Sequence, residues 1–288
     1  MNPSRQLEVP GRVSLVEGKG GLHKIVVETS GSSAEIYLHG AHVTRFEKKG
    51  EAPLLFLSEA SEYTRQNPIR GGVPVIFPWF GPRDGFPGHG YARTTEWEWI
   101  ETSLLPDESV SLRLRLPRHE DFEVEYRVTV GNGLTLELTV SNPGAGDAGF
   151  ETCLHTYFQI SAIEAISITG LSNCGFLDRL TGTHKVDSAP DLRISSEVDR
   201  TYQDTTATVE IHDPGHNRTV RIAKSGSRST VVWNPWIDKS IRLPDFGDEE
   251  YLRMVCVESG NIGPDKTILP AGESTTLRVE ISSGKLLS

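Results

Sequence analysis

The chain has 288 residues, of which 36% are hydrophobic and 24% charged, and its formal net charge is -10 at pH 7. Because an acidic chain without a basic run has no general attraction for polyanions, we expect no binding to nucleic acid or to an acidic membrane surface. No segment approaches the ~18 consecutive apolar residues that a transmembrane helix needs. The hydrophobic content, with 28 glycines and 17 prolines, instead predicts a packed core and many tight turns.

The N-terminus and the cysteines indicate the compartment. The first six residues lack the apolar stretch of a secretory signal. Cys153, Cys174 and Cys256 are odd in number and widely spaced, without a CxxC pair that would suggest zinc or redox chemistry. We therefore predict a cytoplasmic protein with reduced, partly buried thiols. Because large all-β folds reach this length as one unit, we also predict a single domain over residues 1–288.

Alternation of apolar and polar residues with a period of two dominates the chain. From the N-terminus, strands are predicted over residues 24–28, 34–38, 42–47, 110–116, 122–130, 134–140, 165–169, 207–211, 219–222, 230–233, 253–258 and 276–281. The alternation is clearest over residues 110–116, where every second residue is apolar and the others are free to face water. Residues 58–66 form a short polar segment that predicts one or two helical turns between strands.

Two of these predicted strands, over residues 122–130 and 134–140, are separated only by Gly131, Asn132 and Gly133. Such a loop is able to adopt positive φ angles, so the two strands are predicted to form a hairpin. Many strands at short intervals with few helices are typical of antiparallel sheets that cover or close their edges. The sequence therefore predicts an all-β fold, either a sandwich or a barrel.

Four segments interrupt the alternation and hold candidate functional residues. The first covers residues 67–82 and contains four prolines, which cannot all lie inside a sheet because each removes a ladder donor. Within it, Gly71 and Gly72 follow Arg70, so the backbone is able to bend tightly and present a fixed guanidinium. A rigid surface loop with an incidental arginine explains the same spacing equally well.

The second and third segments contain histidines. His89 and Arg93 lie in a glycine-punctuated stretch, where a structural histidine and a surface arginine form the simpler interpretation. His155 lies among apolar residues, and an imidazole that changes protonation near neutral pH is a candidate acid or base. A core histidine bonded to backbone is equally compatible with this segment.

The fourth segment ends an apolar strand with Glu258, which needs partners or a function if it is buried and is otherwise simply solvated. Asp204 is a possible second carboxylate, although a turn aspartate is the simpler interpretation. Metal binding by His89 and His155 lacks HxH or HExxH spacing, and Ser259 lies in no GxSxG elbow. These residue types alone are compatible with acid/base work on a polar ligand and do not name a reaction.

Taken together, the segments resemble the aldose 1-epimerase (mutarotase) superfamily, and within it the hexose-6-phosphate branch. The match is carried by Ile69-Arg-Gly-Gly-Val-Pro-Val-Ile-Phe-Pro-Trp-Phe-Gly-Pro82, His89-Gly-Tyr-Ala-Arg93, Leu154-His-Thr-Tyr-Phe158 and Val257-Glu-Ser-Gly-Asn261, with Trp233-Asn-Pro-Trp236 in support. The resemblance covers residues 20–283 and implies a galactose-mutarotase-like supersandwich of antiparallel sheets.

The same resemblance implies site residues and roles. His155 would be the general acid and Glu258 the general base. The residues that would line the sugar site are Arg70, His89, Arg93 and Asp204. Gly88 stands where this branch often has glutamine, which puts a direct side-chain contact with substrate at that position in question.

The implied chemistry fits these residue types. Opening a pyranose ring requires removal of the proton from the C1 hydroxyl and delivery of a proton to the ring oxygen. Glu258 would take the first proton and His155 would give the second. The open-chain aldehyde then rotates about the bond from C1 to C2 and closes on its other face to give the other anomer. We expect no metal and no cofactor.

The expected partner is a small-molecule hexose 6-phosphate, and we expect a monomer. Arg70 and Arg93 are the candidates for holding the phosphate, because a guanidinium matches phosphate oxygens in a bidentate way. A non-catalytic sugar-phosphate-binding module is one alternative, although it would not need an acid/base pair. A glycoside hydrolase using Asp204 and Glu258 is another, and it leaves His155 without a role.

Overall fold

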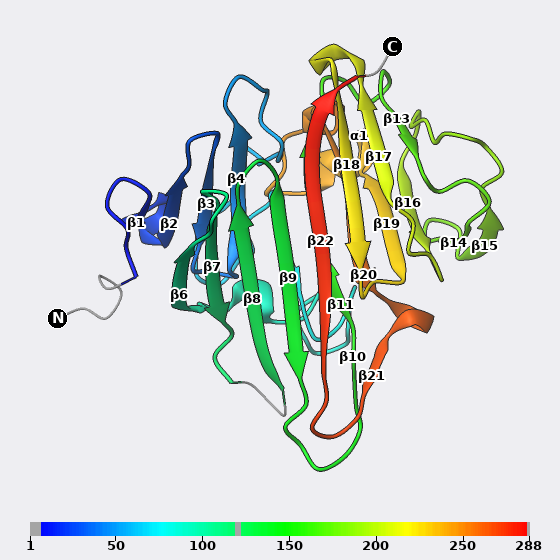
Figure 1. The fold of residues 1–288 in the computed structure, drawn as a ribbon. Helices are drawn as coiled ribbons and strands as arrows, with labels where there is room; N and C mark the ends of the chain where they lie inside the picture. Colours follow the sequence, from blue (N-terminus) through cyan, green and yellow to red (C-terminus); the bar gives the residue numbers. More distant parts are fainter. Residues whose placement is uncertain (1–6, 119–121, 287–288) are drawn as a thin grey trace.

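The structure is a computed structural model that describes residues 7–118 and 122–286. These residues form strands that pair antiparallel in four sheets, which confirms the all-β prediction (Figure 1). No helix in the described part of the chain is long and apolar enough to span a bilayer.

The first large sheet has eight strands, in the order β13-β17-β18-β22-β9-β8-β7-β6. Their bounds are β13 (Ser167–Thr169), β17 (Val209–Asp213), β18 (Arg218–Ser225), β22 (Ser274–Lys285), β9 (Leu134–Ser141), β8 (Glu123–Val130), β7 (Val110–Arg115) and β6 (Glu98–Leu104). Buried residues alternate with more exposed ones along β8 and β9. One face of this sheet is therefore packed and the other is partly open to water.

The second large sheet has the order β15-β14-β16-β19-β20-β11-β5, and β12 also pairs with β20. Its bounds are β15 (Thr183–Val186), β14 (Gly175–Asp178), β16 (Val198–Tyr202), β19 (Ser229–Asn234), β20 (Met254–Asn261), β11 (Thr152–Leu154), β5 (Val75–Ile76) and β12 (Tyr157–Gln159). Every residue of β19 and β20 is buried. These central strands are thus covered on both faces.

Smaller elements complete the fold. Their bounds are β1 (Val13–Glu17), β2 (His23–Glu28), β3 (Ser32–Tyr37) and β4 (His42–Lys48) in a four-stranded sheet, β10 (Ala148–Phe150) and β21 (Thr267–Leu269) in a two-stranded sheet, the helix α1 (Trp236–Arg242), and the 3₁₀ turns η2 (Lys19–Gly21), η3 (Ala92–Thr94), η4 (Pro214–His216), η5 (Glu250–Arg253) and η6 (Gly263–Asp265).

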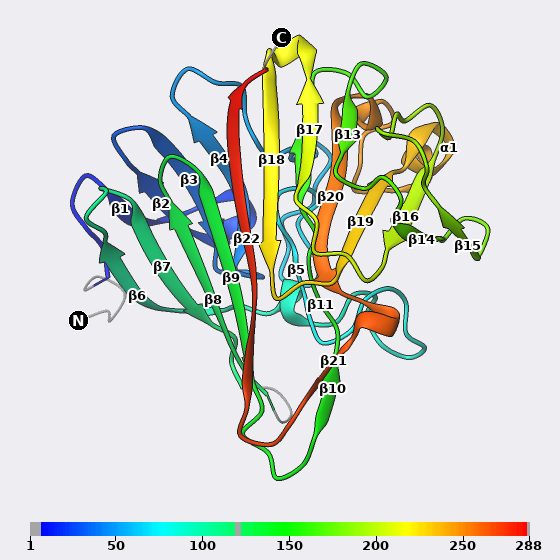
Figure 2. The same ribbon diagram turned by 45° about the vertical axis from the view of Figure 1, so that its right-hand side comes forward.

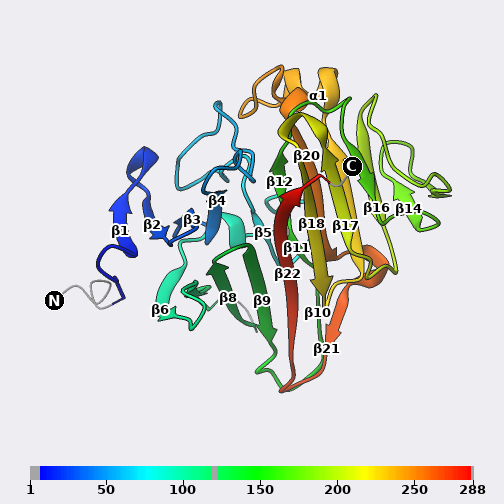
Figure 3. The ribbon, with the colours of Figure 1, turned by 45° about the horizontal axis from the view of Figure 1, so that its top comes forward.

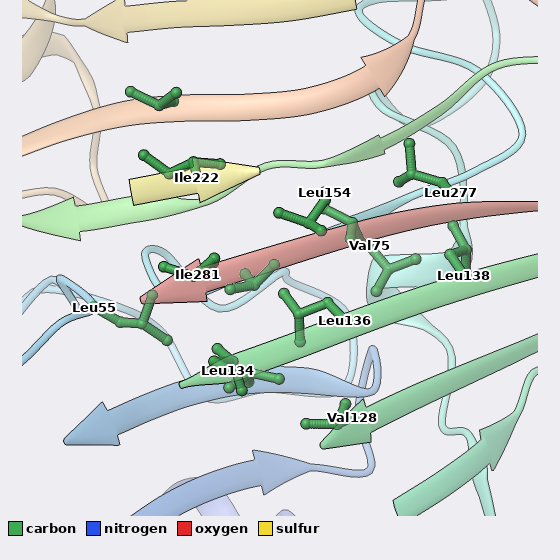
Figure 4. Packing of buried hydrophobic residues seen from close by; sticks show 14 of the residues in the cluster. Leu55, Val75, Val128, Leu134, Leu136, Leu138, Leu154, Ile222, Leu277 and Ile281 are labelled. Atoms are coloured by element: carbon green, nitrogen blue, oxygen red, sulfur yellow. The ribbon is translucent and has the colours of Figure 1, made fainter. Parts of the chain in front are cut away.

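The main core contains buried side chains of both large sheets and of the four-stranded sheet, and the two large sheets lie against each other in Figures 2 and 3. Leu136 of β9 belongs to the same buried cluster as Val75 of β5 and Leu154 of β11 (Figure 4). Fully burying a side chain of this size contributes about 1.5–3 kcal/mol. The core therefore fixes the strands that lead into the candidate site.

All twelve predicted strands overlap an observed strand. The predicted hairpin is confirmed, with Val130 paired to Leu134, but its loop does not use positive φ angles. The two glycines instead allow neighbouring residues to lie close against the loop backbone. A Cβ at Gly131 would lie 2.8 Å from Ser109 Cβ, and one at Gly133 would lie 2.7 Å from the Ile281 carbonyl oxygen.

The predicted helix over residues 58–66 is wrong, because this segment is irregular. The backbone N–H of Glu59 donates to Glu250 at 2.8 Å, and the Ser58 hydroxyl donates to the same carboxylate at 2.6 Å. These groups are satisfied by a distant side chain and not by a helical ladder. Conversely, α1 was not predicted, since its seven residues are too few for a periodic signal.

The cysteine prediction is confirmed. Cys153 and Cys256 are buried, Cys174 is partly buried, and all three are free thiols.

Candidate active site

A cavity of about 360 Å³ opens at the second large sheet and brings together five of the six predicted site residues. These five are Arg70, His89, Arg93, His155 and Glu258. They come from segments far apart in the sequence, so the fold and not local sequence assembles the site.

A break in the sheet places His155 opposite Glu258. On one side of β20, Leu154 of β11 pairs with Ser259 and Tyr157 of β12 pairs with Cys256. The two residues between these strands leave the regular ladder, and the His155 backbone N–H donates to the Pro74 carbonyl at 3.0 Å. The imidazole Nε2 consequently lies 3.3 Å from Glu258 Oε1.

Glu258 lies in the fully buried strand β20 and is 1% exposed. Its second carboxylate oxygen, Oε2, accepts a hydrogen bond from the Cys153 thiol at 3.4 Å. Removal from water raises the pKa of Glu258 well above its usual value, because burial disfavours the charged form more than the thiol favours it. Once ionised, this carboxylate therefore binds a proton more strongly than one in water.

His155 is also buried, and its ring stacks on Tyr157 with the centroids 4.8 Å apart and the planes at 10°. Burial lowers its pKa well below the usual value, and the positive charges of Arg70 and Arg93 act in the same direction. The protonated imidazole is thus a stronger acid than in water. Burial therefore makes Glu258 a stronger base and His155 a stronger acid, and the two side chains are in contact.

Tight backbone packing presents Arg70 to the cavity. Gly71 and Gly72 adopt φ of 110° and 59°, and a Cβ at Gly72 would lie 2.3 Å from the Val43 carbonyl oxygen. No residue with a side chain fits there without strain. The loop is held further by His42, whose Nε2 lies 2.7 Å from the Gly71 carbonyl oxygen.

The Arg70 guanidinium is partly engaged. Nε and Nη2 donate to the two oxygens of Asp245, each at 3.1 Å, and Nη1 donates to the Tyr157 hydroxyl at 3.1 Å. A guanidinium has five N–H donors, so two remain for a ligand. Tyr157 is also the residue on which the His155 ring stacks. Arg70 is therefore linked to His155 through a single side chain.

Arg93 differs from Arg70 because it has no carboxylate partner among the ion pairs of the described residues. Its Nη2 donates to the Gly88 carbonyl at 2.7 Å, while its buried Nε has no hydrogen-bond partner in the part of the chain that the structure describes. Burial, followed by the charge of Arg70, lowers its pKa to about 10. Gly88, which has no side chain, therefore binds Arg93 through its backbone carbonyl oxygen.

His89 supplies a neutral donor. Its Nδ1 accepts a hydrogen bond from the Gly81 backbone N–H at 3.3 Å, which assigns the proton of the neutral ring to Nε2. Burial and the charges of Arg93 and Arg179 lower its pKa to about 3, so the ring is uncharged at neutral pH. The ring contacts Phe80 edge-on, with the centroids 4.7 Å apart.

Sequence reasoning missed several charged residues of the cavity, namely Arg179, Asp199 and Lys239. Arg179 Nε lies 3.6 Å from Asp199 Oδ1, and burial raises the pKa of this aspartate. Lys239 of α1 lies 3.2 Å from Glu197. No motif marks Asp199, and the burial of β16 does not alternate in a way that would have indicated the direction of its side chain.

The structure does not bring Asp204 into the cavity, which corrects the expectation that it lines the site. β16 ends at Tyr202, and Asp204 lies in the following turn with a φ of 50°. Its side chain is 79% exposed and forms an ion pair with Arg228. It lines a separate depression beside Cys174. The carboxylate that β16 does supply to the cavity is Asp199.

One group of potential metal ligands occurs at this site in the described part of the chain. A nitrogen of His155, the sulfur of Cys256 and an oxygen of Glu258 all lie within 4.8 Å of one another, and all three residues are buried.

The chain is similar in sequence and in fold to known proteins. Residues 23–282 match the aldose 1-epimerase family. A protein from Cenchrus ciliaris, provisionally named glucose-6-phosphate 1-epimerase, is 33% identical over 93% of this chain and 87% of its own. A protein of Escherichia coli with the same provisional name is 30% identical over 90% of both chains. The crystal structure of a provisionally assigned mutarotase from Salmonella typhimurium has a TM-score of 0.90 and 27% identity, and it covers 97% of this chain and 96% of that one.

Proposed function

The chain belongs to the aldose 1-epimerase family, and from this premise we propose that it interconverts the α and β anomers of a hexose 6-phosphate, with glucose 6-phosphate as the first candidate. Family membership itself makes it a mutarotase that acts on a sugar. The phosphate and the roles of individual residues are the proposal. Its main support is the buried, unpaired Nε of Arg93 in a cavity of an otherwise acidic protein.

The charge balance of the cavity supports an anionic substrate. Among its cations, Arg70 is compensated by Asp245, Arg179 by Asp199, and Lys239 by Glu197. Within residues 7–118 and 122–286, the partner of Arg93 is the Gly88 carbonyl alone. A buried charge without a partner costs several kcal/mol, so a phosphate oxygen that supplies the missing acceptor gains what the free protein lacks.

In the proposed mechanism, Glu258 removes the proton from the C1 hydroxyl and the protonated His155 delivers a proton to the ring oxygen. The 3.3 Å contact between His155 and Glu258 allows the one proton that the pair holds to pass from one side chain to the other between turnovers. The neutral His89 is positioned to donate a hydrogen bond to a sugar oxygen without adding charge. After rotation about the bond from C1 to C2, the same groups act in reverse to close the ring.

A phosphate bound by these arginines would also favour the acid. Arg70 and Arg93 disfavour a positive charge on His155, and a dianion near them offsets that effect. A phosphorylated sugar therefore both fills the anion site and makes the protonated form of His155 more accessible.

The alternative hypothesis of a glycoside hydrolase loses part of its support. It relies on Asp204 and Glu258 as a carboxylate pair, and Asp204 lies outside the cavity on an exposed turn. A hydrolase would have to recruit another carboxylate, and the contact between His155 and Glu258 would have no assigned purpose.

Anomer exchange measured by NMR on glucose 6-phosphate, galactose 6-phosphate and free glucose tests the proposal, using Arg93→Ala and the exposed control Arg115→Ala. Loss of a hydrogen bond to a charged group corresponds to about 1.5–3 kcal/mol, so Arg93→Ala should raise KM for the 6-phosphate roughly 10- to 100-fold. Arg115 pairs with Glu125 on the other large sheet, and its variant should match the wild type. If Arg93→Ala weakened phosphorylated and free sugars equally, Arg93 would hold ring hydroxyls or the fold, and phosphate recognition would be refuted.

A further inference from the structure

Cys256 is a buried thiol that the proposed mechanism does not use. It lies two residues before Glu258 on β20, so the two side chains point to the same face of the strand. Across the sheet it pairs with Tyr157, the residue that stacks on His155. The thiol therefore lies directly beside the acid/base pair.

The spacing of these three donors approaches that of a zinc site. Tetrahedral zinc binds nitrogen and oxygen at about 2.0–2.2 Å and sulfur at about 2.3 Å, which puts neighbouring ligand atoms about 3.3–3.6 Å apart. His155 Nε2 and Glu258 Oε1 are already 3.3 Å apart. The Cys256 sulfur lies within 4.8 Å of a ring nitrogen of His155 and of a carboxylate oxygen of Glu258, so it needs to approach each of them by about 1.2 Å at most to reach the zinc spacing.

We propose that His155, Cys256 and Glu258 form a Zn²⁺ site with three protein ligands and an open fourth position, and that occupation of this site inhibits the enzyme. One ion would take the lone pairs with which His155 and Glu258 move protons, so binding and turnover exclude each other. The inhibitory effect rests on the proposed roles of these two residues, whereas the binding of the metal does not.

Charge does not oppose this binding, although the cavity is rich in arginines. In their neutral forms, the thiol, the carboxyl and the imidazole have a net charge of zero, and the thiol and the carboxyl together hold two protons that a metal would replace. Zinc displaces both protons and leaves a neutral imidazole, a thiolate and a carboxylate around a dication, again with a net charge of zero. Arg70 and Arg93 consequently face the same net charge in both states.

The experiment uses the whole protein, with Co²⁺ as a spectroscopic probe and Zn²⁺ as the inhibitor. A cobalt ion bound by a thiolate gives a charge-transfer absorption that one bound only by nitrogen and oxygen lacks. Cys256→Ser keeps the size of the side chain while removing the sulfur ligand. Two controls are matched: Cys153→Ser removes the other buried thiol that contacts Glu258, and Cys174→Ser removes the thiol at the separate depression.

We expect the charge-transfer band in the wild type and in both control variants, and its absence in Cys256→Ser. Zinc inhibition, expressed relative to the metal-free rate of each variant, should need at least about tenfold more Zn²⁺ in Cys256→Ser, because even indirect partners of zinc ligands change affinity by about 10- to 100-fold. Addition of a chelator should restore the rate.

Three results would overturn the inference: a band that persists in Cys256→Ser, a band lost in Cys153→Ser instead, or zinc binding without inhibition of a catalytically active wild type. Failure of the proposed function is distinguishable from these, because it would abolish anomer exchange in the metal-free protein while leaving the cobalt band in place. If Cys256→Ser failed to fold, Cys256→Ala would serve in the same comparison.

Discussion

Replacing Glu258 by glutamine should remove activity without destabilising the protein. The substitution keeps the size and shape of the side chain, and its amide oxygen remains able to accept the Cys153 thiol hydrogen bond. The amide cannot take a proton. Since positioned acid/base groups contribute about 10²- to 10⁴-fold, kcat should fall at least about 10²-fold.

The stability effect follows from the raised pKa of Glu258. A carboxyl whose pKa is higher in the folded state contributes most to folding when it is protonated in both states, below its unfolded value of about 4.3. As the pH rises above that value, the unfolded chain loses this proton first and stability falls, by up to about 1.4 kcal/mol per pH unit until the folded group also ionises. Glutamine has no such dependence, so Glu258→Gln should gain stability over the wild type at neutral pH.

Glu250 provides the matched control, because it is also buried but has a structural role. Its carboxylate accepts hydrogen bonds from the Ser58 hydroxyl and from the backbone N–H groups of Glu59 and Gly247. An amide nitrogen facing these donors loses at least one bond. We expect Glu250→Gln to lose about 1–3 kcal/mol of stability and to keep its activity, the opposite outcome to Glu258→Gln.

Chemical denaturation at several pH values and NMR anomer exchange on glucose 6-phosphate measure the two effects. A folded Glu258→Gln within about threefold of the wild-type kcat would remove the base from its role. A variant less stable than the wild type at pH 7 would show that the carboxylate is satisfied in the fold, contrary to the raised pKa.

Three further outcomes follow from the site. His155→Ala should lower kcat at least about 10²-fold, because the proton donor is lost, and steady-state kinetics on the folded variant would reveal any lesser effect. Asp199→Asn should lower kcat/KM by about 10-fold or more if its carboxylate binds a sugar hydroxyl. Asp204→Asn, on the exposed turn, should stay within about threefold of the wild type. A larger loss of kcat/KM in Asp204→Asn than in Asp199→Asn would restore Asp204 to the site. Anomer exchange should persist in a chelator, since the proton transfers are assigned to side chains, and loss of activity on chelation would refute the metal-free mechanism.

The strands could be predicted because their signal is local. Residues 134–140 bury every second side chain, and residues 110–116 bury all of their apolar side chains, which are spaced by two, so both strands produce a pattern in the sequence. The central strands β19 and β20 are buried on both faces and show apolar runs in place of alternation. Short strands such as β5 and β11, of two and three residues, exist only because long-range partners hold them, so no local pattern marks them.

The site was predictable only where a motif marked it. Arg70, His89, Arg93, His155 and Glu258 lie in motifs that resemble a known family, and the structure gathers them in one cavity. Asp199 and Arg179 lie outside those motifs, and only the pairing of β16 with β14 and β19 brings them to the same place. The mistaken choice of Asp204 shows the limit, because a carboxylate five residues away along the chain faces a different depression.

The position of Glu258 links the fold to the chemistry. A carboxylate in the middle of a doubly covered strand opposes folding, and it would ordinarily be replaced by an apolar residue. Here the same burial gives the carboxylate its strength as a base, and the gap between β11 and β12 supplies an imidazole whose acid strength is raised by the same removal from water. An exposed pair would be easier to fold, but its pKa values would return toward those in water. We therefore infer that the stability lost at Glu258 and the proposed rate of proton transfer have one physical origin, and that variants which hydrate this pair should gain stability and lose rate together.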